Sequence, residues 1–439
     1  MLVTGAILAA SILILAGTGG WLWLERQWSA WEPPAGPAAK VGYEAFTHGP
    51  FGLEVMPLKY AAVAAAVSPD AFTTGLEDGR SVWRTFGFLD NPAAGADDKP
   101  VCAGNAAEKL PYGFAVTNSL PSTAYQTPVA FAALTCASCH SGQIRKADGS
   151  LSKIVSGMGN PELDVIAFSD AIRNAVADPT LSADRILDAY EAQCGSGEAG
   201  WLDRQIERLV LDSWIGAIRS TVGADFAKYG LPFRGAEMKD ARFIPAGPGR
   251  TRPFRSVVRV VLDLPGLENY AYSKIPAVFE QRSDLRPRSQ YDGSIKSQVT
   301  RSYIAAYTSG SSVLALSKPA VEHSIREAAA YTEELGLSIP VASFAEVFPD
   351  AAPAEAEVAR GFDVYMAHCA KCHGYRPLDG GQWAAKGEWL HQFEYLDGRD
   401  RPKPIGVDGA RVRFRYAQAL PLPLWTALPG PGAIADEQA

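Results

Sequence analysis

The strongest constraint on this chain is the pattern Cys-x-x-Cys-His, which occurs at Cys136–His140 and again at Cys369–His373. Two thiols separated by two residues span the gap between the two vinyl groups of a haem, and the adjacent imidazole then reaches the iron. Each copy therefore predicts one covalently bound c-type haem. We expect thioether bonds from Cys136, Cys139, Cys369 and Cys372, and iron ligation by His140 and His373.

Two other functions of paired cysteines fit the sequence less well. A redox dithiol would have to occur twice, and each time with an unneeded histidine beside it. A zinc ribbon usually separates its two cysteine pairs by roughly 15–20 residues. Here the pairs lie near residues 136 and 369, so the gap is far longer. Two haems, with their iron, remain the predicted cofactors.

Composition narrows the class of protein further. The chain has 439 residues, of which 47% are apolar and 20% charged, and its mean hydropathy is -0.04. These values exclude a disordered tail, a collagen-like fibre and a multi-spanning membrane protein. With 41 Lys and Arg against 48 Asp and Glu, the net charge is -7. Because nucleic acids require a basic face, we expect no nucleic-acid partner.

The N-terminal segment predicts export. Residues Met1–Leu24 carry no charge and are long enough to cross a bilayer core of roughly 30 Å as a helix. Tryptophans at and beyond its end suit a membrane interface, which favours a retained anchor. The alternative is a cleaved signal peptide, with small residues at Ala16–Gly20 near the cut. Either way we expect a periplasmic protein, and an anchor would hold it at the inner membrane.

In such an oxidising compartment Cys102 and Cys194 are expected to form a disulfide, with two buried thiols as the alternative.

Helical patterns dominate the rest of the chain. Asn160 before Pro161 predicts a helix start, apolar spacing predicts a helix over 201–222, and Pro319 opens another that runs to about Glu334. Strand-like runs are few and short, such as Val257–Leu262. A joint at 347–353 completes the expected organisation. It consists of an anchor or signal segment at 1–34, an elaborated first haem domain at 35–350, and a second haem domain at 351–439.

The residues that precede the second motif form a recognisable pattern. Gly361, Tyr365 and Cys369 follow one another at four-residue spacing, which resembles the opening helix and haem-binding turn of ordinary c-type cytochromes. The apolar spacing within 354–367 is consistent with a helix. The first motif is instead preceded by Pro128–Thr135, which has no comparable helix signature. The expected fold is thus mostly α, with cytochrome c-like helical haem domains and long loops after an N-terminal membrane-spanning helix.

The larger layout resembles exported di-haem c-type cytochromes related to bacterial di-haem cytochrome c peroxidases and rubber oxygenases. Three segments carry the resemblance, namely 46–54 (FTHGPFGLE), 157–161 (GMGNP) and 275–282 (IPAVFEQR), the last followed by 291–294 (YDGS). Members of that family often place a histidine where this chain has Gln290. The downstream Tyr/Phe-His-Asn/Asp-Gly stretch common in those enzymes is also missing. The resemblance therefore implies a di-haem cytochrome more strongly than an oxygenase or a peroxidase.

The sixth ligands of the two irons decide between an electron carrier and an enzyme. A carrier closes both axial positions, whereas peroxide or oxygen chemistry needs one left open. None of the five methionines lies after His373, so the second haem cannot take the downstream methionine of an ordinary module. Its candidates are His391, His323 and Met238, whereas His368 lies too close to the motif. For the first haem they are Met158 and His48.

We expect the two haems to be inequivalent, with one reduced iron open to carbon monoxide. The predicted function is periplasmic electron transfer with a redox partner protein or a small donor or acceptor. The alternative is a haem-dependent peroxidase or oxygenase with one open iron. The basic stretch at 239–259 forms either a solvated face or partners for haem propionates.

Overall fold

The computed structural model describes the chain in several stretches. The described residues are 35–72, 82–94, 100–121, 126–146, 148–195, 201–229, 247–251, 273–282, 297–349, 353–370, 375 and 377–378. The predicted membrane-spanning run at 1–24 and the predicted strand at 257–262 fall outside them. Among the described residues no helix is both long enough and apolar enough to span a membrane.

A three-stranded antiparallel sheet lies at the centre of the molecule. Its strands are β1 (Glu54–Pro57), β2 (Phe114–Ser119) and β3 (Gln126–Leu134), in the order β1-β3-β2. In the register, Glu54 pairs with Ala133 and Phe114 with Leu134. The short pairs β4–β5 (Ser141–Gly142, Val155–Ser156) and β6–β7 (Arg250–Thr251, Ser273–Lys274) complete the described strands.

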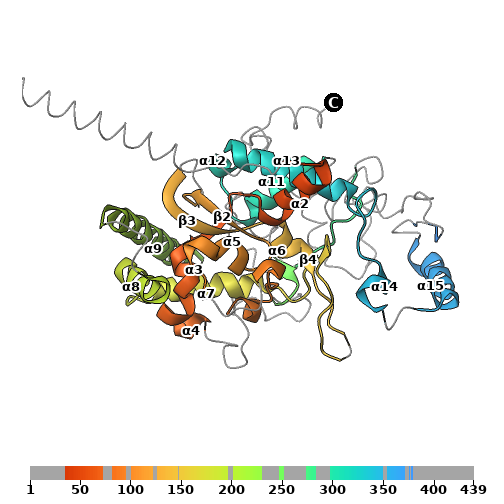
Figure 1. Ribbon diagram of the computed structural model, residues 1–439, viewed down its shortest axis with the longest axis horizontal. Coiled ribbons are helices and arrows are strands. Elements are labelled where there is room, and N and C mark those ends of the chain that lie inside the picture. The colour runs from red at the N-terminus through yellow and green to blue at the C-terminus, as the bar shows by residue number, and fades with distance from the viewer. Residues whose placement is uncertain are drawn as a thin grey trace, which may run out of the picture.

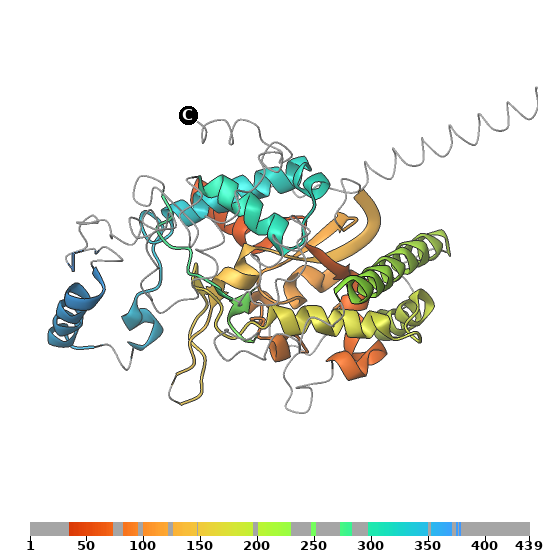
Figure 2. The same cartoon turned by 180° about the vertical axis from the view of Figure 1, so that it is seen from behind.

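Helices cover the sheet on two sides, so the fold is mostly helical as expected (Figures 1 and 2). The first group lies above the sheet in Figure 1 and comprises α2 (Ala38–His48), α11 (Gln298–Ser309), α12 (Val313–Leu316) and α13 (Pro319–Glu334). The second lies on the other side and comprises α3 (Leu58–Val67), α4 (Pro69–Phe72), α7 (Val165–Ala177), α8 (Ala183–Cys194) and α9 (Trp201–Tyr229). The shorter elements are η2 (Val82–Phe86), η3 (Pro92–Ala94), η4 (Ala103–Asn105), α5 (Ala106–Lys109), α6 (Cys136–His140) and α14 (Phe344–Val347), and the last described helix is α15 (Glu355–His368).

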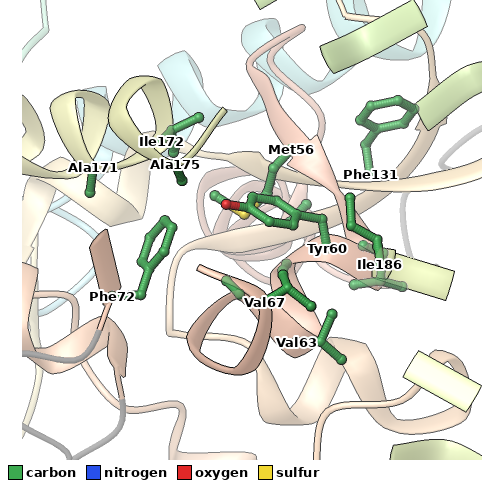
Figure 3. Packing of buried hydrophobic residues seen from close by; sticks show 14 of the residues in the cluster. Met56, Tyr60, Val63, Val67, Phe72, Phe131, Ala171, Ile172, Ala175 and Ile186 are labelled. Atoms are coloured by element: carbon green, nitrogen blue, oxygen red, sulfur yellow. The ribbon is translucent and has the colours of Figure 1, made fainter. Parts of the chain in front are cut away.

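Each helical group builds its own hydrophobic core. The larger core joins α3, α7, α8 and α9 to the sheet, and Tyr60 on α3 lies at its centre. The Tyr60 ring lies 6.3 Å from the ring of Phe72 and 5.3 Å from that of Trp214, and Figure 3 shows Met56 and Phe72 beside it. The smaller core joins α2, α11 and α13 through residues such as Phe46.

The structure confirms the predicted disulfide. Cys102 and Cys194 are bonded, with their Cα atoms 5.8 Å apart. The bond ties the end of α8 to the loop before η4. Beside it the Ala103 amide donates to the Tyr190 hydroxyl at 2.7 Å.

Three of the four predicted helices occur where the sequence places them. The structure has α9 (Trp201–Tyr229), which is longer than the predicted 201–222, together with α13 and α15. The predicted start at Asn160 is wrong, because α7 begins at Val165 with Asp164 as its N-cap. The Asn160 side chain instead accepts from the amides of Glu162 and Leu163, at 3.0 and 3.2 Å, and closes a turn ahead of the helix.

Candidate functional site

The first Cys-x-x-Cys-His motif forms a single short helix, α6, directly after the sheet's central strand. Thr135 is its N-cap, and the Thr135 hydroxyl accepts from the Ala137 amide at 3.3 Å. The same hydroxyl lies 2.8 Å from the Gly113 carbonyl oxygen and 3.1 Å from that of Thr47. The Ser138 hydroxyl also donates to the Gly113 carbonyl. The turn is thus fixed to the start of β2 and the end of α2.

A glycine is required where β2 approaches this turn. Gly113 has φ +86°, and a Cβ there would lie 2.3 Å from the Ser138 nitrogen. Any other residue would push the strand away from α6 and break the bonds to the Gly113 carbonyl.

The two thiols occupy neighbouring positions on one helical turn. Cys136 packs against the smaller core and Cys139 against the larger one, and both are half-buried and free of disulfide bonds. Burial raises the pKa of each thiol to about 12, although the Arg301 charge opposes this at Cys136. Redox-active and metal-binding cysteines depend on a lowered thiol pKa, so this environment does not favour a dithiol redox centre.

The His140 imidazole is held in one tautomer. Its Nδ1 lies 2.9 Å from the carbonyl oxygen of Pro276, and because a carbonyl only accepts, Nδ1 carries the proton. Burial lowers the pKa of His140 to about 4, and the nearby Arg301 charge acts in the same direction. The hydrogen bond to Pro276 has the opposite effect and raises the pKa. At neutral pH the ring is therefore uncharged, and its Nε2 keeps a lone pair. Metal-ligating histidines characteristically donate their other ring nitrogen in this way.

The three segments that carried the family resemblance all meet at this turn. The first segment, 46–54, supplies the carbonyl of Thr47. In the second, the amides of Gly157 and Asn160 donate to the carbonyls of His140 and Cys139, each at 2.8 Å. The third supplies the Pro276 carbonyl, and the Val278 amide donates to Gly157 at 2.7 Å. Segments distant in sequence therefore form the walls of one site.

Arg301 on α11 provides a positive charge close to the motif. Its guanidinium donates to the Gln281 side chain, and its charge lowers the pKa values of both Cys136 and His140. A guanidinium suits carboxylates such as haem propionates. No sequence pattern pointed to this residue, since the basic stretch that could serve propionates lies at 239–259, of which only 247–251 is described.

The second motif is described only in part. Cys369 caps the C-terminal end of α15, where its amide donates to Tyr365 at 2.8 Å, but Cys372 and His373 lie outside the described residues. Helix α15 buries none of its side chains, and it lies at one side of the molecule in both views (Figures 1 and 2).

The candidate sixth ligands occupy different surroundings. Met158 packs against Gly142, two residues beyond His140. His48 ends α2, with its Nδ1 3.4 Å from the Phe114 carbonyl oxygen. His323 is exposed on α13, while Met238 and His391 lie outside the described residues.

The donor set of the first motif fits a haem better than a bare metal ion. In the described part of the chain, no three His, Cys, Asp or Glu side chains gather into a group that could hold a metal ion. Two thiols and one imidazole that keeps a lone pair on Nε2 are the groups that covalent haem attachment uses. No protein-family model, curated protein or solved structure matches the chain.

Proposed function

We propose that this chain is an exported di-haem c-type cytochrome that transfers single electrons on the periplasmic side of the membrane. The observation that carries the proposal is His140, whose Nδ1 is fixed by the Pro276 carbonyl and whose uncharged ring keeps a lone pair on Nε2. Cys136, one helical turn before His140, and Cys139, directly before it, would supply the two thiols for thioether bonds. The repeat of the motif at Cys369–His373 supplies the second haem.

The roles of the residues at the first haem follow from their positions. A bound haem supplies one-electron redox chemistry at its iron. His140 would ligate that iron, and the Pro276 carbonyl would orient the ring and increase its basicity. Arg301 would pair with a haem propionate and so add a positive charge beside the site. The cores on either side of α6 would limit the access of water to a bound haem and so tune its reduction potential.

Haem content of cysteine variants tests the proposal. The pyridine haemochrome assay should find two covalent haems per chain in the parent. It should find one in Cys136→Ser/Cys139→Ser and one in Cys369→Ser/Cys372→Ser. The matched control is Cys102→Ser/Cys194→Ser, which removes two cysteines that form a disulfide and should keep both haems. A parent with one haem or none would refute the proposal.

A second candidate function is a haem-dependent peroxidase or oxygenase with one open iron. It is favoured by the sequence after His373, which contains no methionine to close the second iron. Spectra of the reduced protein with and without carbon monoxide distinguish the two functions, because only an open iron binds the gas. Two six-coordinate, low-spin haems without a carbon monoxide shift would exclude this candidate.

Location in the periplasm is part of the same proposal. The Cys102–Cys194 disulfide suits an oxidising compartment, and the uncharged segment Met1–Leu24 suits an inner-membrane anchor. The partners would be a redox protein or a small donor or acceptor, and not nucleic acid. Fractionation of cells followed by N-terminal sequencing tests both points. A soluble mature form that begins after Gly20 would indicate a cleaved signal instead of an anchor.

A further inference from the structure

Three tyrosines from distant parts of the chain gather next to the first motif. The hydroxyl oxygens of Tyr43 on α2 and Tyr112 before β2 lie 3.1 Å apart. The Tyr112 hydroxyl also lies 3.5 Å from that of Ser156 on β5. Tyr331 on α13 completes the cluster, with its ring 6.0 Å from that of Tyr43. Its hydroxyl bonds to Ser156, and this bond lowers the pKa of Tyr331, whereas burial raises it.

The cluster adjoins the Cys136–His140 turn at two points. Ser156 pairs with Ser141, which follows His140 directly, and the next residue, Gly157, donates its amide to the His140 carbonyl. Tyr112 immediately precedes Gly113, the residue whose carbonyl binds the side chains that cap α6. The shared hydroxyls therefore lie beside the backbone that holds the histidine.

The tyrosines connect the interior with the surface. Tyr112 and Tyr331 are 5% and 6% exposed, whereas Tyr43 is partly exposed. Burial raises the pKa of Tyr112 and that of Tyr331, so both phenols stay protonated at neutral pH. A phenol of this kind loses an electron readily only if its proton can leave at the same time. The bond between the Tyr112 and Tyr43 hydroxyls offers such a route.

We propose that Tyr112 and Tyr43 form a one-electron relay between the first haem and the protein surface, with a hydroperoxide as the oxidant. This rests on the open-iron candidate function. Peroxide would oxidise the open second iron, which would then draw an electron from the first haem. Tyr112 would give one electron to the first haem, and its phenolic proton would pass to the Tyr43 oxygen while Tyr43 releases its own proton to solvent. The Tyr112 radical then takes the hydrogen atom of the Tyr43 hydroxyl across 3.1 Å. An external hydrogen-atom donor of the phenol or hydroquinone class restores Tyr43.

Freeze-quench electron paramagnetic resonance of the full-length haem protein mixed with hydrogen peroxide tests the relay. The parent should give a tyrosine radical, identified by a narrower spectrum after incorporation of ring-deuterated tyrosine. Tyr112→Phe should lose that radical, because the phenol next to the motif is removed. Tyr43→Phe, a change at a partly exposed position, removes the oxygen that accepts the Tyr112 proton, so the radical should form in lower yield than in the parent, and added hydroquinone should remove it more slowly.

The matched control is Tyr60→Phe. Tyr60 is also buried and its hydroxyl donates to Ser68 at 3.1 Å, but it belongs to the larger core. This variant should keep the parent signal. A parent that carries the first haem but forms no tyrosine radical, or a radical that persists in Tyr112→Phe, would overturn the relay and leave the cytochrome proposal intact. Absence of the haem itself, measured on the same samples, would overturn both.

Discussion

Gly159 controls the distance between the haem-motif loop and the segment that orients His140. A Cβ placed on Gly159 would lie 2.2 Å from the Ile275 carbonyl oxygen, whereas an ordinary carbon–oxygen contact is about 3.3 Å. Gly159→Ala must therefore move Ile275 and Pro276 by about 1 Å. A shift of that size, directed away from His140, would lengthen the 2.9 Å bond to Nδ1 to about 4 Å, beyond hydrogen-bonding range.

The expected cost combines the overpacking, about 1–3 kcal/mol, with the lost hydrogen bond, about 1 kcal/mol. Chemical denaturation should therefore show an unfolding free energy lower by about 2–4 kcal/mol. In the haem protein the reduction potential of the first haem should rise, because a less basic imidazole stabilises ferric iron less.

Gly216→Ala on α9 is the matched control for this prediction. A Cβ there meets nothing within 4 Å, and alanine within a helix should stabilise the protein by about 0.5–1 kcal/mol. If Gly159→Ala has the unfolding free energy and the reduction potential of the parent, the approach of Ile275 does not position the His140 ring.

Three further predictions concern the disulfide, the motif histidine and a buried charge. Replacing Cys102 and Cys194 together by serine should lower the unfolding free energy by about 2–4 kcal/mol, because the bond closes a loop with a sequence separation of 92; an unchanged denaturation midpoint would contradict this. In protein produced without haem, the His140 pKa is about 4 in the folded state, against 6.5 for a free histidine side chain. Stability should be fully present above pH 6.5 and should fall by at most about 3 kcal/mol as the pH drops to 4; His140→Gln should not show this fall, and a flat parent profile would refute the lowered pKa. Burial raises the pKa of Glu54, and the Lys318 charge opposes that rise, so Lys318→Met removes a charge that stabilises the ionised carboxylate. The loss of unfolding free energy should be larger at pH 7 than at pH 4, where Glu54 is protonated; equal losses in urea titrations at both pH values would contradict this.

Helices with a local signature could be predicted from the sequence. Helix α13 begins at Pro319 because proline suits the first helical position, and it ends at Glu334, just before Gly336. Helices α9 and α15 followed from the spacing of their apolar residues. The disulfide between Cys102 and Cys194 was predicted from the even number of remaining cysteines, without any knowledge of their distance.

The sheet and the start of α7 could not be predicted in this way. Strand β3 reads as a run of small apolar residues without alternation, because it is the central strand and is covered on both faces. Asn160 has the side chain of a helix cap, but the Asp164 amide bonds to the Phe86 carbonyl at 2.8 Å. That contact with η2 holds Asp164 outside the helix, which begins only at Val165.

The local sequence determines which reactive groups the first site has, because the groups that attach a haem lie within five consecutive residues. Spacing alone places Cys136, Cys139 and His140 on one turn of helix. The state of that histidine depends instead on contacts made by the folded chain. The carbonyl that fixes its tautomer belongs to Pro276, 136 residues further along the chain, and the charge that faces it belongs to Arg301. Every residue has a backbone carbonyl, so the pattern of side chains cannot identify the one that bonds to His140. Only the fold, which brings the two segments together, decides it.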